Sequence, residues 1–288
     1  MSDAERAFTV LDVLKASEAW LEKRGVDAPR RSAELLLGHV LGLDRLHLYL
    51  AHDRPMSGPE RDRMRALLRR RGAHEPVAYL IGSWSFFGLD LEVAPAVLVP
   101  RPETEMLVEL AFERIPEGGR VVDLGTGSGA IALAIAARRP DAKVLATDIS
   151  EEALRIARSN AARLGLAVTF REGSWWEACA GEWFDVVVSN PPYVDPSRPD
   201  LLGSGVAEFE PSLALFTPSG DPAASYRALI AGLPSHLVAG GSALFETGVG
   251  AAEAALEAMR RAPFLGDVEV RSDPAGLPRV LLARMRAP

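Results

Sequence analysis

A strand, a glycine-rich turn and a helix follow one another within residues 121–137, and no other part of the chain limits the fold as closely. The glycines of the turn are Gly125, Gly127 and Gly129. Glycine lets the backbone turn tightly there and lie close to a ligand. A second strand, residues 143–147, ends in Asp148, whose carboxylate can accept hydrogen bonds from both hydroxyls of a ribose. The segment predicts the opening of a doubly wound nucleotide-binding sheet.

A second constrained stretch lies further along, where the apolar run of residues 185–188 leads into Asn190-Pro191-Pro192-Tyr193. Because proline fixes φ and restricts the residue before it, the strand must end in a stiff, extended loop. Such a loop holds the side chain of Asn190 and the carbonyl of Pro191 as two fixed hydrogen-bond acceptors, with the ring of Tyr193 close by. A planar NH2 group, which has two protons to donate, fits this frame.

The glycine turn alone leaves two classes of enzyme open. Gly125, Gly127 and Ala130 also fit the dinucleotide-binding pattern in its Gly/Ala form, so the turn suits a nicotinamide enzyme as well as one that binds adenosylmethionine. The proline-rich loop favours the second class, because a methyltransferase acting on an NH2 nitrogen needs such a frame and a dehydrogenase does not. The plainer interpretation of that loop is a proline-capped strand with a buried tyrosine.

Residues 123–129 and 190–193, taken together, resemble the class I S-adenosylmethionine-dependent methyltransferases that modify planar NH2 groups. Further segments narrow the resemblance to the protein glutamine methyltransferases, and within them to the family that methylates the Gly-Gly-Gln loop of peptide chain release factors. These segments are residues 75–82, 86–88, 97–105, 209–211, 214–215, 273–276 and 279–280. The resemblance implies transfer of a methyl group from S-adenosylmethionine to the side-chain amide nitrogen of a glutamine in a release factor.

The two motifs and the resemblance together predict the site residues. The catalytic group comprises Asn190, Pro191, Pro192 and Tyr193. The residues expected at the cofactor are Gly125, Thr126, Gly127, Ser128, Gly129, Asp148, Ile149, Trp175 and Asn190. In the family, Trp175 matches the aromatic residue beside the adenine, whereas Ser174 stands where similar enzymes often carry an acidic residue for the adenine amine. No metal is expected, since Cys179 is the only cysteine and the five histidines lack ligand spacing.

Changes of pattern divide the chain into three predicted parts. Residues 1–72 carry only helical apolar stripes and are expected to form a small all-helical substrate-docking domain. Residues 73–101 are predicted to be a β-hairpin linker, and residues 102–288 the methyltransferase domain, an α/β unit with a doubly wound Rossmann-like sheet. The last helix of the first part is expected to present arginines outward, either as a solvated face or to dock an acidic protein such as a release factor. These arginines are Arg61, Arg63, Arg65, Arg69, Arg70 and Arg71.

Two segments outside the motifs are also candidates for the site. Thr104 fits either a simple helix cap or, as in the family, a residue that faces the methionine end of the cofactor. The loop from Tyr193 to about Ser219 is long and rich in proline and glycine, and loops of that length in compact domains are usually functional or disordered. We therefore expect it to act as a lid over the substrate groove.

Charge and hydropathy limit the partners. The 288-residue chain has a net charge of −7 and a pI near 5.4, which argues against a nucleic-acid footprint. It has no run of about 18 apolar residues, so we expect a soluble, cytoplasmic protein that acts as a monomer and contacts no membrane. Three alternatives stay open: a ribosomal-protein glutamine methyltransferase, a DNA adenine N6-methyltransferase, and an adaptor that only binds the cofactor.

Overall fold

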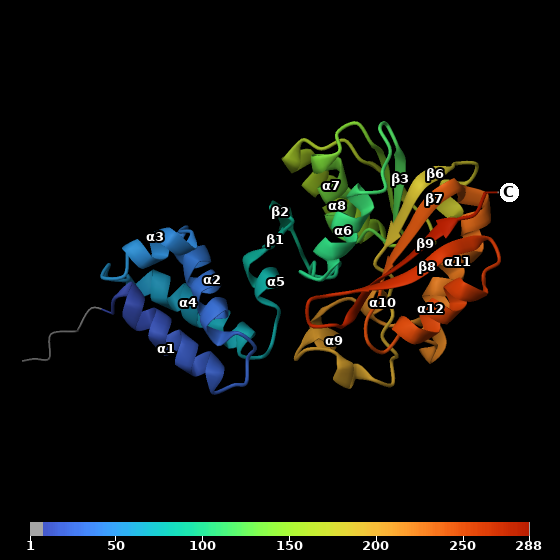
Figure 1. Ribbon diagram of the computed structural model, residues 1–288. Coiled ribbons are helices and arrows are strands. Elements are labelled where there is room, and N and C mark those ends of the chain that lie inside the picture. Colours follow the sequence, from blue (N-terminus) through green and yellow to red (C-terminus); the bar gives the residue numbers. More distant parts are fainter. Residues whose placement is uncertain (1–7, 288) are drawn as a thin grey trace, which may run out of the picture. The chain divides into compact units, whose positions relative to one another are not determined.

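The computed structural model describes residues 8–287, which form two compact units (Figure 1). The helical unit contains the residues up to Gly82 together with Leu202–Phe209. The sheet unit contains Ser83–Leu201 and the chain from Glu210 onward. Within the described residues, no helix is long and apolar enough to cross a membrane.

The helical unit is a bundle of short helices, three of which begin at a capping side chain. Its helices are α1 (Val10–Glu22), α2 (Pro29–Leu41), α3 (Arg45–Leu50), α4 (Gly58–Arg71), α5 (Val77–Ile81) and α9 (Val206–Phe209). Thr9 caps the N-terminus of α1, and Ser57 with Glu60 forms a capping box at the start of α4. The apolar faces meet in one core, which includes Leu14, Leu21, Leu36, Leu37, Leu48 and Met64.

The helical unit ends later in the sequence than the apolar stripes predict. The predicted boundary lies at residue 72, but the unit continues to Gly82 because α5 packs against α2 and α4 and contributes Leu80 to the core. The segment Leu202–Phe209 also belongs to this unit. There Gly205, with φ of 81°, lies so close to His74 that a Cβ would stand 2.3 Å from its carbonyl oxygen.

One member of the predicted outward arginine face is buried. Arg71 is 8% exposed, so its assignment to the outer face is wrong. Its guanidinium donates to Ser32 Oγ at 3.2 Å and to the backbone carbonyl of Glu75 at 2.9 Å. A guanidinium has five N–H donors, so these carbonyl and hydroxyl partners explain how it is accommodated inside.

A two-stranded hairpin opens the sheet unit. It consists of β1 (Ser83–Phe86) and β2 (Leu89–Glu92), paired antiparallel. The turn residues Phe87 and Gly88 both have positive φ, 49° and 76°, which is the geometry of a two-residue hairpin loop. The hairpin thus lies within the predicted linker, residues 73–101.

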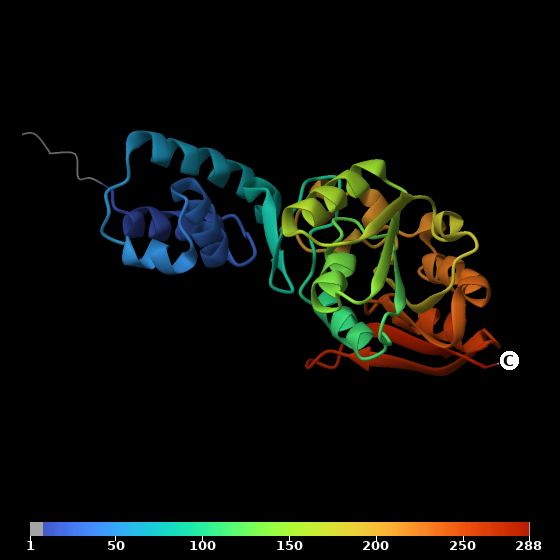
Figure 2. The same ribbon diagram turned by 90° about the horizontal axis from the view of Figure 1, so that it is seen from above.

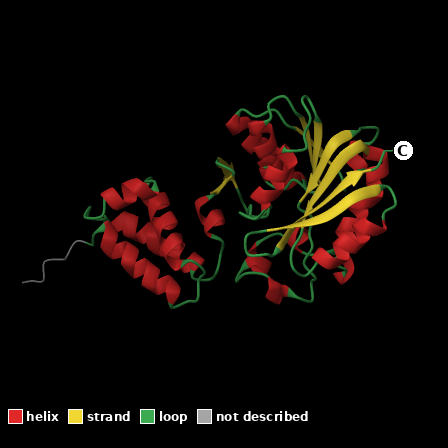
Figure 3. Ribbon diagram, viewed as in Figure 1, coloured by secondary structure: helices red, strands yellow, loops and turns green. Residues whose placement is uncertain are grey.

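The main sheet has seven strands in the order β5-β4-β3-β6-β7-β9-β8. Figure 3 shows the strands of this sheet in yellow and the helices around them in red. The strands are β3 (Arg120–Leu124), β4 (Lys143–Asp148), β5 (Thr169–Glu172), β6 (Phe184–Ser189), β7 (Leu237–Glu246), β8 (Leu265–Ser272) and β9 (Pro278–Met285). Strands β3 to β7 pair in parallel, whereas β9 pairs antiparallel with both β7 and β8. Figure 2 shows β8 and β9 side by side at one edge of this sheet. The predicted doubly wound α/β fold is confirmed, with an antiparallel edge.

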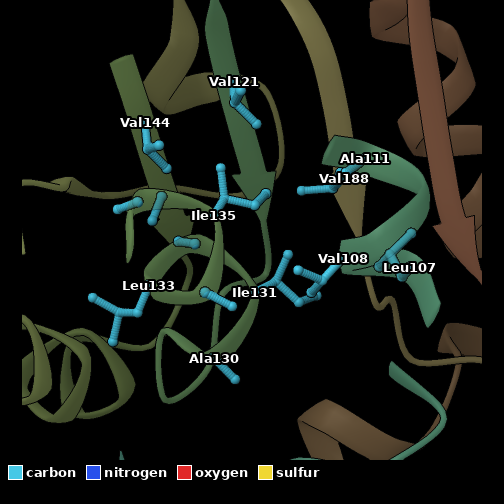
Figure 4. Close-up of a cluster of buried hydrophobic side chains, with 14 of the residues drawn as sticks. Leu107, Val108, Ala111, Val121, Ala130, Ile131, Leu133, Ile135, Val144 and Val188 are labelled. Carbon is cyan, nitrogen blue, oxygen red and sulfur yellow. The ribbon is translucent and has the colours of Figure 1, made fainter. Parts of the chain in front are cut away.

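Helices cover both faces of the sheet. The helices of the sheet unit are α6 (Thr104–Phe112), α7 (Ala130–Arg138), α8 (Glu151–Leu164), α10 (Ser212–Leu215), α11 (Ala224–His236) and α12 (Ala252–Arg261). Single turns of 3-10 helix lie at Glu177–Cys179, Pro199–Leu201 and Pro218–Gly220. Val186 and Val188 of β6 pack on the α6 and α7 side, while Val187 packs on the α11 and α12 side. Figure 4 shows the first of these clusters, where Leu107 and Val108 of α6 meet Ile131 of α7 and Val188.

The strand order reverses at β3. From β3 the chain runs outward through β4 to β5, and then returns to the other side of β3 as β6. Ligands of open α/β sheets bind outside the carboxyl ends of the strands at such a switch point. The glycine turn after β3, Asp148 at the end of β4 and the proline-rich loop after β6 all lie at this edge.

Candidate active site

The glycine turn is held in place by the end of β4. The N–H groups of Gly125 and Thr126 both donate to the carbonyl of Thr147, at 2.9 Å each. The N–H of Gly127 donates to Oδ2 of Asp148 at 2.8 Å. Gly127 has a φ of 57°, and a Cβ there would have nothing within 4 Å, so its conformation rather than crowding requires glycine.

The buried carboxylate of Asp123, near the end of β3, holds the glycine turn in place. Its Oδ2 accepts hydrogen bonds from the Thr126 hydroxyl at 2.6 Å and from the N–H of Ala132 at 3.2 Å. Burial raises the pKa of Asp123 to about 7. The sequence motif contains Asp123, but sequence reasoning gave it no place in the site. An apolar strand with one carboxylate just before a glycine turn was the signal that could have marked it.

Asp148 faces the pocket with its carboxylate already partly engaged. Oδ2 accepts from Gly127, and Oδ1 accepts from the N–H of Ser150 at 2.9 Å. Burial raises the pKa of Asp148, and these backbone hydrogen bonds oppose that rise. Each carboxylate oxygen accepts more than one hydrogen bond, so the group retains capacity for a ligand.

A cavity of about 330 Å³ opens among these elements. Of the predicted site residues, those that line it are Gly125, Thr126, Gly127, Ser128, Asp148, Ile149, Trp175, Asn190 and Pro192. Gly129 does not line it but serves as the N-cap of α7. Pro191 and Tyr193 do not line it either, and both lie in the loop that carries Asn190. The structure therefore brings most of the predicted residues to one pocket.

One wall of the cavity is apolar. Ile149 is 52% exposed although it is a large aliphatic residue, and it lines the cavity. Trp175 has a φ of 47°, which is rare for a bulky side chain, and its ring lies 3.8 Å from the position of a Cβ on Gly125. A strained backbone conformation of this kind persists only where the surrounding structure holds the residue in place. An exposed isoleucine and a strained tryptophan together make a surface for a flat apolar ring.

The proline-rich loop is tied down on both sides. The Ser189 hydroxyl donates to the carbonyl of Leu124 at 2.6 Å, and the Ser225 hydroxyl donates to the carbonyl of Pro192 at 2.8 Å. The amide nitrogen Nδ2 of Asn190 donates to Oγ1 of Thr104 at 3.4 Å. This bond uses the donor end of the amide and leaves Oδ1 of Asn190 available as an acceptor.

Tyr193 is partly buried against the core on the α11 and α12 side and is not among the residues that line the cavity. A Cβ on Gly248 would lie 2.9 Å from its Cε2 atom, so glycine is needed for the close contact. Burial raises the pKa of the Tyr193 phenol, with the Glu246 carboxylate adding to the rise. The phenol therefore stays protonated at neutral pH.

Several lining residues come from segments that had no firm predicted role. They are Ala96, Val97, Leu98, Pro100 and Thr104 before and at the start of α6, and Pro211, Leu213, Ala214, Phe216, Pro218 and Ser225 around α10 and α11. The second group includes part of the predicted lid loop. The run of prolines and apolar residues before Thr104, and the length of that loop, were the available signals.

In the part of the chain that the structure describes, no group of three or more His, Cys, Asp or Glu is placed to hold a metal ion. His236, for example, stacks on Trp176 with ring centroids 4.8 Å apart, and its Nδ1 contacts the carbonyl of Glu182. It is a packing residue.

Together with the fold and the pocket, the family matches show that this is an S-adenosylmethionine-dependent methyltransferase. Residues 102–202 match the family model "Methyltransferase small domain", and residues 12–82 match "PrmC N-terminal domain". A methyltransferase from Pyrococcus furiosus has the same fold, with a TM-score of 0.53 and 21% identity over 77% of this chain and 98% of that one. The 16S rRNA N2 G1207 methyltransferase of Thermus thermophilus also has this fold, with a TM-score of 0.53 and 20% identity over 71% of this chain and 50% of that one.

Two full-length relatives give the family. The release factor glutamine methyltransferase of Geobacter sulfurreducens is 39% identical over 99% of this chain and 100% of its own length. The release factor glutamine methyltransferase of Neisseria gonorrhoeae is 43% identical over 89% of this chain and 93% of its own length. The chain belongs to the release factor glutamine methyltransferase family.

Proposed function

We propose that this protein transfers a methyl group from S-adenosylmethionine to the side-chain amide nitrogen of the glutamine in the Gly-Gly-Gln motif of peptide chain release factors. The observation that carries the proposal is Asn190 at the pocket, with its NH2 bonded to Thr104 and its Oδ1 available. The names of the relatives support the choice of substrate.

The cavity residues fit the proposed cofactor. Asp148 would accept hydrogen bonds from the ribose hydroxyls, and Trp175 and Ile149 would contact the adenine. The turn from Gly125 to Gly129 would bring backbone close to the methionine part. The cavity volume of about 330 Å³ lies within the range of small-molecule sites.

The protein's task in the reaction is to orient one nitrogen. S-adenosylmethionine supplies a methyl group on a sulfonium, which is already a strong electrophile. Oδ1 of Asn190 and the carbonyl of Pro191 would each accept a hydrogen bond from the glutamine NH2. These two bonds would hold its nitrogen toward the methyl group. Both acceptors also draw electron density toward the nitrogen as it attacks. No general base is needed before attack, because the nitrogen becomes acidic only after it is alkylated.

A direct assay tests the substrate. The protein is incubated with methyl-labelled S-adenosylmethionine and either a release factor or a large-subunit ribosomal protein, and the labelled residue is mapped by mass spectrometry. We expect label on the glutamine of Gly-Gly-Gln. Label on the ribosomal protein alone would favour the related ribosomal enzyme, and no transfer to either protein would favour an adaptor.

Cofactor choice gives a prediction about stability. S-adenosylmethionine at about 100 times its Kd should stabilise the fold by about 2.7 kcal/mol, which corresponds to a rise in Tm of about 5–10 °C. Nicotinamide dinucleotides should leave Tm unchanged. Differential scanning calorimetry measures both, and stabilisation by a nicotinamide dinucleotide alone would contradict the assignment.

The helical unit is proposed to dock the protein substrate. A groove of about 370 Å³ between α1 and α4 is lined by apolar side chains, among them Trp20, Met64 and Leu68. Arg61, Arg65 and Arg69 also line it, and their spacing of four residues places them along one face of α4. A groove of this kind fits an acidic segment of the substrate that carries an apolar anchor.

Charge reversal at the groove should lower methylation of an intact release factor but not of a short peptide. Arg69→Glu is expected to lower kcat/KM for an intact release factor by about 10-fold at low salt, and by less at high salt. Its rate on a short Gly-Gly-Gln peptide should not change. The matched control is Arg260→Glu, an exposed arginine on α12 of the sheet unit. Equal effects of the two variants on the intact substrate would rule out docking at the groove.

A further inference from the structure

A buried carboxylate that the mechanism above does not use joins two distant segments of the chain. Glu210 is 4% exposed. Its Oε2 accepts from the N–H of Val99 at 3.0 Å, and its Oε1 accepts from Nη2 of Arg101 at 2.6 Å. A buried carboxylate is costly unless it is paired, so these two hydrogen bonds, the Glu210 link, must stay formed in the folded protein.

Both segments that the Glu210 link joins line the cavity. Leu98 and Pro100, on either side of Val99, are lining residues, and so is Pro211, which directly follows Glu210. Val99 is 3% exposed, and neither it nor Glu210 is among the residues that line the cavity. The link therefore holds two parts of the cavity wall together from behind.

A second anchor fixes the other end of the segment that begins at Glu210. The N–H of Val194 donates to the carbonyl of Leu215 at 3.0 Å, and the N–H of Thr217 donates to the carbonyl of Val194 at 2.9 Å. Val194 comes directly after the proline-rich loop. Residues 211–216, the wall strip, are therefore held between the Glu210 link and the loop that carries the proposed catalytic group.

The wall strip faces the part of the cavity that the cofactor residues do not occupy. Its lining residues include Leu213, Ala214 and Phe216, and Leu213 is 58% exposed although it is a large aliphatic residue. The residues assigned to the ribose and the adenine all come from other segments. We therefore expect the wall strip to contact the protein substrate.

The segment on the other side of the Glu210 link leads to Asn190. The carbonyl of Arg101 accepts from the N–H of Thr104 at 3.1 Å. Oγ1 of Thr104 in turn accepts from Nδ2 of Asn190 at 3.4 Å. A shift of Arg101 would therefore move both the support of Asn190 and its distance from the wall strip.

We propose that Glu210 is a positioning residue, which sets the width of the substrate end of the cavity by fixing the wall strip relative to Arg101. The inference rests on the proposed function, because this end has a substrate to position only if a glutamine enters beside Asn190. Glu210 touches neither substrate nor cofactor, since its side chain is only 1% exposed and lies behind the wall.

A single-atom exchange in the full-length protein tests the inference. Glu210→Gln keeps the shape but replaces one oxygen by NH2, so either Val99 or Arg101 loses its acceptor. We expect kcat/KM to fall by about 10-fold or more, because a small misplacement of a positioning group slows a reaction strongly. The fall should be the same for an intact release factor and for a short Gly-Gly-Gln peptide. The Kd for S-adenosylmethionine, measured by calorimetry, should not change.

Variants of the partner test whether Glu210 acts through Arg101. Arg101→Met removes the donor and the charge and should lower kcat/KM by about 10-fold, whereas Arg101→Lys restores a charged donor and should bring it to within about 3-fold of wild type. Because both residues belong to one link, the double variant Arg101→Met/Glu210→Gln should be no slower than the slower single variant. Effects that multiply would show that the two residues act independently and would overturn the inference.

A matched control separates positioning from a loss of stability. Glu34 of α2 is 6% exposed and accepts from Arg30 at 2.8 Å and from Arg45 at 2.9 Å. Glu34→Gln therefore alters a buried carboxylate that is paired with arginine but lies in the helical unit. It should lower Tm and leave kcat/KM for the short peptide at the wild-type value. An equal fall for Glu34→Gln and Glu210→Gln on the peptide would contradict a positioning role.

The wild-type rate on a release factor tests the proposed function, and the ratios between variants test the inference. A wild-type kcat/KM for Glu210→Gln would overturn the inference and leave the proposed function standing. If Glu210→Gln fails to fold, the more exposed partner decides: a wild-type kcat/KM for Arg101→Met on the peptide would equally overturn it.

Discussion

Replacement of Asn190 by alanine is expected to lower the rate of methyl transfer by about 10²-fold or more. The variant removes the acceptor that fixes the substrate NH2, but leaves the glycine turn, Asp148 and Trp175 in place. Affinity for S-adenosylmethionine should therefore fall only modestly. Single-turnover rates with saturating cofactor measure the first effect, and calorimetry measures the second.

A finer variant separates the two ends of the Asn190 amide. Asn190→Asp retains an acceptor for the substrate but loses the donor to Thr104 and adds a charge. It should keep more activity than the alanine variant if accepting from the substrate is what matters. A normal rate for Asn190→Ala would remove the basis of the proposed mechanism, whatever the behaviour of the aspartate variant.

Replacement of Asp148 by alanine should weaken binding of S-adenosylmethionine by about 10²-fold. Two hydrogen bonds from ribose hydroxyls to a carboxylate would be lost, each worth about 1.5 kcal/mol or more. The N–H groups of Gly127 and Ser150 would also lose their acceptor, which loosens the turn. Isothermal titration calorimetry gives the change in Kd.

The control for Asp148 lies at the other end of the same strand. Asp141 precedes β4 and accepts from the N–H of Gly118 at 2.9 Å and from Arg139. Asp141→Ala should lower Tm without changing cofactor affinity. If Asp148→Ala bound the cofactor as tightly as Asp141→Ala, the ribose would have to be held by other residues.

Short-range signals in the sequence were enough to predict the parts of the site that lie within one loop. The glycines at 125, 127 and 129 have φ values of 76°, 57° and 85°, conformations that glycine adopts readily. Asp148 stands at the end of β4, and the prolines end β6, as strand periodicity and proline geometry predict. The caps at Thr9 and Ser57 are also local, since each side chain accepts from a backbone N–H three residues further on.

Long-range packing decided what local patterns do not encode. The bond between Asn190 and Thr104 joins residues 86 positions apart, and it forms because α6 packs beside β6. Arginines usually lie at the surface, yet inside the helical unit Arg71 donates to the carbonyl of Glu75 and to that of Asp27, which is 44 positions away in the sequence. Its burial therefore could not be read from α4 alone.

Local sequence was therefore enough to predict the glycine turn, the end of β4 and the proline-rich loop, because each depends on the φ and ψ of a few adjacent residues. The tertiary structure alone decided that α5 extends the helical unit to Gly82, and that Thr104 and the segment at Leu213 complete the cavity wall. Such contacts depend on how buried surfaces from separate segments fit together, and periodicity within one segment does not specify that fit.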